Sequence, residues 1–405
     1  MNPVDSDLIG SRLPRAAGGS AAGSAAASAV SAFSADLFAA LAPSSTDNLV
    51  CSPYSVAVAL GMAVQGARGT TAAQILDVLH SDDARALAEG LNAIDSALAV
   101  RSGGSGDSVE DTDDAEIELA SANSLWGQRG VHWEQPFLDV LARDFGTGVR
   151  VVDYRETAAA RAAINDWVAE QTRQRIPDLV PPGALAADTR LSLVNAIYLK
   201  APWLKPFPAA GTQDAAFHRL DGSTVSSPLM GGTVGTRFVS GPGWEAVDLP
   251  YAGGELAMAV VVPQAGRFAE VERSVTGPWL SALLTDLRPG PVRVRLPRWT
   301  IRTRFDLSGV LSGMGMPVAF TGEADFGSIA AEEELKISAV LHEGFIAVDE
   351  EGTEAAAATA VAMRTLSVAA EPRSVVADRP FLYLIHDLPT GTPLFIGRVL
   401  DPTVE

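Results

Sequence analysis

The side chains that could carry out catalysis are few in this chain and lie far apart in it. The 405 residues include five histidines, at positions 80, 132, 218, 342 and 386, and a single cysteine, Cys51, within an apolar run. No Gly-x-Ser-x-Gly, Ser-x-x-Lys, His-Glu-x-x-His or P-loop pattern occurs. One cysteine excludes an internal disulfide, a Cys-x-x-Cys motif and a cysteine-based zinc site. We therefore predict that the chain is not an enzyme.

The segment from Val348 to Met363, VDEEGTEAAAATAVAM, could act in another way, because its backbone N–H and C=O groups could pair with the strands of a sheet. A helix would have no reason to carry Gly352 and two threonines here. In a strand, alternate residues would share one uniformly small and uncharged face: Thr353, Ala355, Ala357, Thr359 and Val361. Glu354 would lie on the other face. The pattern predicts a loop that can enter an existing sheet as a strand, although low-complexity linkers have a similar composition.

The composition limits the class of protein and its partners. The hydrophobic content of 47% is enough for a large core, and a length of 405 residues is compatible with one elaborate domain. A net charge of −19 argues against nucleic acid, heparin-like polyanions and anionic membranes as partners. Acidic clusters at 111–114 and 332–334 are typical of solvated surface rather than of metal sites. Only three of the 30 basic residues are lysine, which indicates a GC-rich, bacterial genome.

The first 23 residues are rich in Gly, Ala and Ser, and we expect them to form a flexible segment before the folded domain. They lack an uninterrupted apolar stretch behind a basic start, so they do not resemble a secretory signal. No run of eighteen consecutive apolar residues predicts a membrane span. The expected location is therefore the cytoplasm, unless the chain is exported by another route.

Apolar periodicity and turn residues predict the elements that must position this segment. Helices are expected at 24–42, from Ser52 onward, after Gly69, and at 134–145 and 157–172. Strands are expected at 116–126, 191–199, 246–249, 256–262, 292–296, 337–348, 381–387 and 394–399. A helix-rich first half and a strand-rich second half predict an α+β domain covering residues 24–405.

Several blocks of this sequence resemble the serpin family, in the family's order and over residues 24–405. They are NLVCSPYSVAVALGMAVQGARGTTAAQILDVL, LVNAIYLKAPWLKPF, VRLPRWTIRTRFDL, LHEGFIAVDEEGTEAAAA and RPFLYLIHDLPTGTPLFIGRVLDP. The resemblance implies helices packed around a large central mixed sheet, with further sheets and an exposed reactive-centre loop at about 350–378. It identifies the hinge of that loop as Glu350, Glu351, Gly352, Thr353, Glu354, Ala355, Ala356, Ala357, Ala358 and Thr359.

The resemblance also implies two residue clusters that control the opening of the central sheet. Ser52, Ser55, Asn195 and His342 match the buried polar group called the shutter. Trp203, Arg298 and Glu350 match the breach at the top of the sheet, where an Arg298–Glu350 pair would hold the hinge closed. Taken as a surface ion pair, it would contribute only about 0–1 kcal/mol. Ser52 is also expected to cap the helix that begins at Pro53.

The family's spacing from the hinge glycine places the bond attacked by the protease at Leu366–Ser367. A leucine suits the wide apolar pocket of a chymotrypsin-like or subtilisin-like protease, and it cannot pair with a buried pocket carboxylate as arginine does. Arg364 is the alternative, since the stretch from Ser367 to Pro380 is longer than in compact relatives. A register shifted by two residues would select a trypsin-like target.

The activity that the resemblance implies is suicide inhibition of a serine endopeptidase, as a covalent acyl complex formed by a metastable monomer. No cofactor and no metal are expected. A serpin-fold protein that acts instead as a binding protein or chaperone is the alternative. Large or charged residues at the inserting positions would favour that alternative, and the sequence has none there.

Overall fold

The computed structural model describes residues 8–102, 117–353 and 372–404. Its helices are α1 (Ser20–Leu41), α2 (Pro53–Val64), α3 (Gly69–Val78), α4 (Ala84–Ser102), α5 (Gln135–Phe145), α6 (Thr157–Gln171), α7 (Phe268–Ser274), α8 (Gly277–Asp286) and α9 (Ser308–Met314). The strands of the first half are β1 (Leu8–Ile9), β2 (Leu49–Cys51), β3 (Glu118–Gln128), β4 (Val149–Val152) and β5 (Leu191–Pro202). The later strands are β6 (Gln213–His218), β7 (Thr224–Gly241), β8 (Trp244–Pro250), β9 (Leu256–Pro263), β10 (Arg288–Pro297), β11 (Trp299–Asp306), β12 (Ile337–Val348), β13 (Gly352–Thr353), β14 (Arg373–Val376), β15 (Phe381–Asp387) and β16 (Pro393–Val399).

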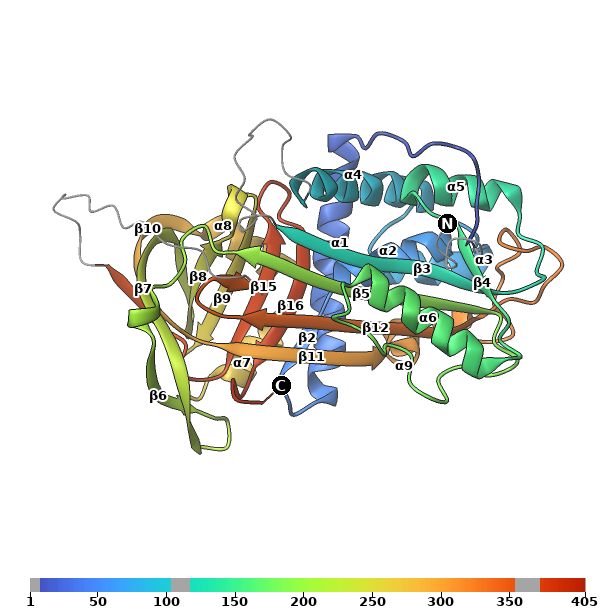
Figure 1. The fold of residues 1–405 in the computed structure, drawn as a ribbon. Coiled ribbons are helices and arrows are strands. Elements are labelled where there is room, and N and C mark those ends of the chain that lie inside the picture. Colours follow the sequence, from blue (N-terminus) through green and yellow to red (C-terminus); the bar gives the residue numbers. More distant parts are fainter. Residues whose placement is uncertain (1–7, 103–116, 354–371, 405) are drawn as a thin grey trace, which may run out of the picture.

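A central sheet of seven strands, in the order β1-β4-β3-β5-β13-β12-β11, spans the molecule. Its long strands run side by side across Figure 1, and α6 lies over one face. Under α6 a small core joins Ile164 and Trp167 of the helix to Ala196 of β5 and Phe345 of β12. The opposite face packs on α2 and the main core. The sheet is thus buried on both sides, as the nearly continuous apolar run of β5 predicts.

A second sheet has the order β14-β10-β7-β8-β9-β15-β16-β2, with β6 beside β7. It occupies the left part of Figure 1, and a bridge between Trp203, just after β5, and Tyr251, just after β8, joins the ends of the two sheets. Every residue of β9, β15 and β16 is buried, which accounts for their largely apolar sequences. The two sheets surround one main hydrophobic core, so the α+β domain predicted from the sequence is confirmed.

The folded part of the chain begins earlier than the predicted residue 24. Helix α1 starts at Ser20, and β1 pairs with β4 through Leu8 and Ile9. The Arg15 guanidinium donates to Asn92 and forms an ion pair with Asp95, so α4 also holds this segment. Local composition predicted flexibility, but these partners lie about 80 or more residues away in sequence.

Helix α1 is apolar and long enough to cross a membrane by length and composition alone. In the fold it packs against α2, α4 and α8, and half of its most apolar window is buried. The same test is passed by core helices of soluble proteins, and the packing of α1 is of that kind.

Candidate functional site

The hinge strand β13 lies between β5 and β12 at one end of the central sheet. Gly352 is opposite Pro202, and Thr353 is opposite Ala201 on β5 and Val348 on β12. A Cβ atom at Gly352 would lie 2.2 Å from the Ala201 carbonyl oxygen, and the residue has a φ of +155°, so only glycine fits. Thr353 is fully buried, and its hydroxyl lies 2.7 Å from that of Tyr251. Gly352 and Thr353 of the predicted hinge are therefore already part of the sheet.

Away from β13, strands β5 and β12 are paired directly with each other. Their parallel register runs from Leu191 opposite Ile337 to Tyr198 opposite Phe345. No strand separates them over this length of the described sheet. In the described sheet, β5 and β12 are therefore separated only at one end, by the two residues of β13.

The predicted breach residues meet beside the hinge. Arg298 donates to Glu350 Oε1 from Nε at 3.0 Å and from Nη2 at 2.6 Å, and the Thr212 hydroxyl donates to the same oxygen. The Trp203 indole N–H donates to the Asp349 carbonyl oxygen at 3.0 Å. The Trp203 backbone N–H donates to the Glu351 carbonyl oxygen at 2.8 Å. Side chains and backbone together hold the turn that precedes Gly352.

The Arg298–Glu350 contact is more buried than the surface pair that the sequence predicted. The Glu350 side chain is only 8% exposed, whereas that of Arg298 is 49% exposed. Burial alone would raise the pKa of Glu350, but hydrogen bonds from Arg298 and Thr212 outweigh it and lower that pKa. The pKa of Arg298 is raised, chiefly by its hydrogen bond to Glu350. Removing Arg298 would leave a largely buried carboxylate with one neutral donor.

The predicted shutter residues meet near the middle of the sheet, where α2 begins. His342 Nε2 accepts the Ser52 backbone N–H at 3.0 Å, and His342 Nδ1 lies 3.1 Å from Asn195 Oδ1. The Ser52 hydroxyl caps α2 by accepting the Ser55 backbone N–H at 3.2 Å, as predicted. All four side chains are fully buried. The cluster connects β5, β12 and α2 through hydrogen bonds.

These contacts fix the protonation of His342. Because Nε2 accepts a backbone N–H, the ring must be neutral, with its proton on Nδ1 donated to Asn195. Burial lowers the pKa of His342 to about 3. Asn195 Nδ2 is buried and has no hydrogen-bond partner among the described residues. Both ring nitrogens of His342 therefore have a hydrogen-bond partner, whereas the side-chain NH₂ group of Asn195 has none among the described residues.

Sequence reasoning missed Asn123 of β3, which extends the shutter cluster. Asn123 Oδ1 accepts the Ser55 hydroxyl at 2.5 Å, and its Nδ2 donates to Ser121 at 2.8 Å. Asn123 is also the β3 residue opposite Asn195. The signal in the sequence was weak: Ser121 and Asn123 are polar residues two apart in a predicted strand.

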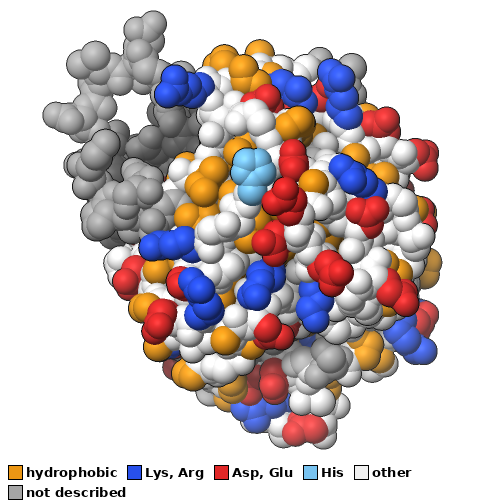
Figure 2. Space-filling model, turned by 90° about the vertical axis from the view of Figure 1, so that its right-hand side faces the viewer, with side chains coloured by type: hydrophobic (Ala, Val, Ile, Leu, Met, Phe, Trp, Pro, Cys, Tyr) orange, Lys and Arg blue, Asp and Glu red, His pale blue; other side chains and the backbone are white. Residues whose placement is uncertain are grey.

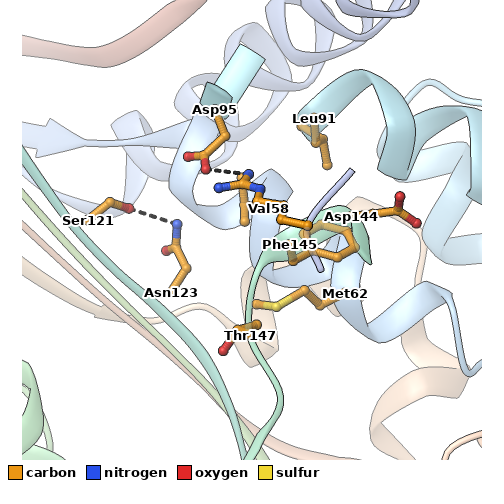
Figure 3. A pocket seen from close by; sticks show the side chains of 10 residues that line it. Val58, Met62, Leu91, Asp95, Ser121, Asn123, Asp144, Phe145 and Thr147 are labelled. Carbon is orange, nitrogen blue, oxygen red and sulfur yellow. Dashed lines mark hydrogen bonds and ion pairs between the residues drawn. The ribbon is translucent and has the colours of Figure 1, made fainter. Parts of the chain in front are cut away.

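Asn123 and Ser121 also line a small cavity of about 120 Å³ beside the shutter cluster. Figure 3 shows this cavity, which is also lined by Asp95 and by its ion-pair partner Arg15. Tyr54 of α2 donates to the other oxygen of Asp95 at 3.2 Å. The N-terminal segment therefore packs close to the residues that connect β3 to the shutter.

The remaining predicted site residues lie outside the described part of the chain. They are the reactive bond Leu366–Ser367, the alternative Arg364, and the hinge residues Glu354, Ala355, Ala356, Ala357, Ala358 and Thr359. Among the described residues no group of three or more His, Cys, Asp or Glu side chains is arranged to hold a metal ion.

A central sheet entered at one end by a hinge strand, above a buried polar cluster, defines a protein with the serpin fold. The sequence model described as serpin (serine protease inhibitor) matches residues 28–402. The crystal structure of Serpin48 from the insect Tenebrio molitor superimposes with a TM-score of 0.81, at 29% identity over 93% of this chain and 98% of that chain. This chain belongs to the serpin family.

Two relatives extend the comparison. An uncharacterized serpin-like protein of Thermococcus kodakarensis is 36% identical over 382 residues, which are 92% of this chain and 85% of the relative. The leukocyte elastase inhibitor of Sus scrofa is 32% identical over 384 residues, 91% of this chain and 97% of the relative. The description of the family names its members as serine protease inhibitors.

Proposed function

We propose that this chain inhibits serine endopeptidases as a suicide substrate, acting as a monomer without a cofactor. The observation that carries the proposal is the position of Thr353. It is fully buried between β5 and β12 and paired with both, while the same two strands are joined directly farther down the sheet. Two hinge residues thus already lie at one end between these strands, and the small residues that follow Thr353 in the sequence could extend them as a strand.

The register of β13 specifies where each following residue would lie in an extended strand. Thr353 is opposite Ala201 and Val348, and an antiparallel strand advances one residue as its partner recedes by one. Thr359 would then lie between Asn195 and His342. Its hydroxyl could accept a hydrogen bond from the unpaired Asn195 Nδ2 group. It could also replace the present contact between His342 and Asn195.

The other face of the inserted strand is also compatible with its neighbours. In the same register Glu354 would be opposite Lys200 of β5, and opposite charges across a strand pair are favourable. On this face Ala356 and Ala358 would be opposite Tyr198 and Ala196, which are buried. From 355 to 359 only alanine and threonine side chains would have to be accommodated between the two strands.

The length of the sheet supports Leu366–Ser367 as the reactive bond. An extended strand would place Met363 opposite Leu191, the first residue of β5. Leu366 would then lie just beyond the far end of the sheet. Moving thirteen residues at about 3.3 Å each would carry a protease bound at Leu366 about 43 Å from the hinge. The reactive residue would be delivered to the opposite end of the molecule.

The proposed reaction begins as ordinary proteolysis. The protease serine attacks the Leu366 carbonyl carbon, the Leu366–Ser367 peptide bond breaks, and Ser367 leaves with a new amino group, so Leu366 becomes an ester on the protease. Insertion replaces one parallel ladder by two antiparallel ladders. About ten added hydrogen bonds at roughly 1 kcal/mol each supply on the order of 10 kcal/mol. That energy is available to distort the protease before water hydrolyses the ester.

The proposed target has a wide apolar specificity pocket, because Leu366 is a branched aliphatic residue. The relative named leukocyte elastase inhibitor supports a protease target for this chain. A trypsin-like protease acting at Arg364 is the second candidate. A binding or chaperone role without inhibition is disfavoured by the residues after Thr353, because alternate positions are small and uncharged.

The test mixes the purified chain with an equimolar amount of chymotrypsin and analyses a denaturing gel and the released peptide by mass spectrometry. A denaturant-stable complex with a fragment that begins at Ser367 supports both the mechanism and the bond. Cleavage there without a complex indicates a substrate rather than an inhibitor of this protease. A fragment that begins at Thr365 redirects the search to trypsin-like targets. Chymotrypsin with its active-site serine blocked is the control and should form no complex.

A further inference from the structure

Most arginines of this acidic chain are paired with carboxylates. Examples are Arg237 with Asp248 and Arg398 with Glu272. Figure 2 shows the result on one face of the molecule, where cationic and anionic side chains lie among one another. A group of neighbouring cations without carboxylate partners is therefore unusual in a chain with a net charge of −19.

Such a group lies on the exposed face formed by β7, β10 and β14. It consists of Lys205, Arg293 and Arg295, called here the cationic patch. Within the described part of the chain, no carboxylate oxygen lies within ion-pair distance of any of the three. The Lys205 ammonium group donates to the Thr233 carbonyl oxygen at 3.1 Å. Arg293 and Lys205 are exposed, and Arg295 is half-buried.

The strand register brings the three cations together. Arg293 is opposite Thr233 on β7, the residue to which Lys205 donates. Residues opposite each other on neighbouring strands lie about 5 Å apart, so Arg293 and the Lys205 ammonium group both lie next to Thr233. Arg295 follows Arg293 on the same face, about 7 Å along the strand. Its cross-strand neighbours are Gly231 on β7 and Val376 on β14, and its side chain is half-buried.

The cationic patch lies between the two ends of the segment that contains the predicted reactive bond. Ser374, in the strand that follows this segment, is opposite Arg293. At the other end Lys205 is two residues from Phe207, whose backbone N–H donates to the Glu350 carbonyl oxygen in the hinge at 2.9 Å. The cationic patch is therefore close to both described ends of the segment that contains residues 364–367.

We propose that the cationic patch is an accessory contact for an acidic surface beside the active site of the target protease, an inference that rests on the proposed function. Opposite charges across such an interface accelerate association and select among proteases with the same pocket. Leu204, next to Lys205, is 57% exposed, which suits a protein surface better than a polyanion. A long polyanion would also extend beyond the three cations onto the rest of the molecule, which is acidic and would repel it.

The test compares the association rates of active-site-titrated chymotrypsin and succinylated chymotrypsin, in which lysine ammonium groups have become carboxylates. For the wild-type chain we expect about tenfold faster inhibition of the succinylated enzyme at 50 mM salt, with little difference at 1 M. The Lys205→Glu/Arg293→Glu variant should lose or reverse this preference. The matched control is Arg12→Glu/Lys336→Glu, which makes the same change in net charge at exposed residues away from β7, β10 and β14 and should keep the preference. A Lys205→Ala/Arg293→Ala variant, milder for folding, should show a smaller loss.

Three results would overturn the inference. The first is a patch variant that forms covalent complexes at normal stoichiometry and prefers succinylated chymotrypsin as strongly as the control variant does. This result would overturn the role of the cationic patch but not the proposed inhibitory function. No covalent complex with either form of the protease would overturn the proposed inhibitory function and the patch with it. Retention of the wild type but not the patch variant on heparin, with unchanged protease rates, would assign the patch to a polyanion.

Discussion

His342 of β12 lies directly across from Asn195 of β5, with its Nδ1 atom 3.1 Å from the Asn195 Oδ1 atom. This contact is the hydrogen bond that a strand inserted between β5 and β12 must break. The register of β13 would place Thr359 between the two residues. The loop thus carries, at the one position that needs it, a hydroxyl that can replace the lost contact.

Replacing Thr359 by valine should therefore weaken the inserted form and leave the native form unchanged. Loss of the hydroxyl leaves buried polar groups of Asn195 and His342 without a partner, at a cost of about 1–3 kcal/mol. The measurement is guanidinium unfolding of the loop-cleaved and the intact protein. Thr359→Ser keeps the hydroxyl and should retain most of the stability. Equal stability of the cleaved valine variant and the cleaved wild type would show that Thr359 does not reach the shutter.

Thr353→Arg should convert the inhibitor into a substrate. Thr353 is fully buried against Tyr251, so an arginine would have to leave the sheet and would prevent insertion from starting. The fraction of covalent complex with chymotrypsin should fall at least tenfold while cleavage of the loop continues. Glu354→Arg, which places the same side chain on the opposite face, should be much less harmful. Wild-type stoichiometry for Thr353→Arg would contradict the insertion mechanism.

Arg298→Ala should destabilise the closed hinge by about 1–3 kcal/mol, because it leaves the 8% exposed Glu350 side chain without its cation. The native transition should move to lower temperature, and the uncleaved protein should lose inhibitory activity faster on incubation. Adding Glu350→Gln to Arg298→Ala should recover part of the loss, since no charge is then left buried. A double-mutant cycle in which the two effects simply add would argue against a direct coupling.

Acidification should destabilise the native state partly through His342. In the unfolded chain this histidine binds a proton below its ordinary pKa near 6.5, whereas in the folded chain burial delays protonation to about pH 3. Its contribution to stability is therefore present above pH 6.5 and is lost as the pH falls toward 3, at about 1.4 kcal/mol per pH unit. His342→Gln should remove that slope between pH 6.5 and 4 in urea unfolding. Parallel curves for the two proteins would contradict the assignment.

Leu366→Arg should change the class of protease that is inhibited. The variant should form covalent complexes with trypsin and lose at least tenfold in association rate with chymotrypsin, because the pocket carboxylate of a trypsin-like protease pairs with arginine. Arg364→Leu is the control and should change neither rate much. Trypsin complexes that depend on Arg364 rather than on residue 366 would show that the reactive bond follows Arg364, two residues earlier than proposed.

Local patterns in the sequence predicted much of the fold, because burial imposes a period on each element. Strand β12 was predicted with the bounds that the structure has, and α6 within one residue. The N-cap at Ser52 was also predicted correctly, since capping depends on residues adjacent in sequence. The family resemblance added the breach and shutter residues, which the structure brings together.

The sequence by itself predicts which residues could enter the sheet, because alternation of small side chains is a property of one segment. Only the tertiary structure decided how far entry has gone, since Thr353 pairs with strands about 150 residues away and five residues away at once. Asn123 and the cationic patch also depend on register between distant strands. Arg15 depends on contact with α4. Such pairings leave no local period, so they follow from the packing of the whole chain.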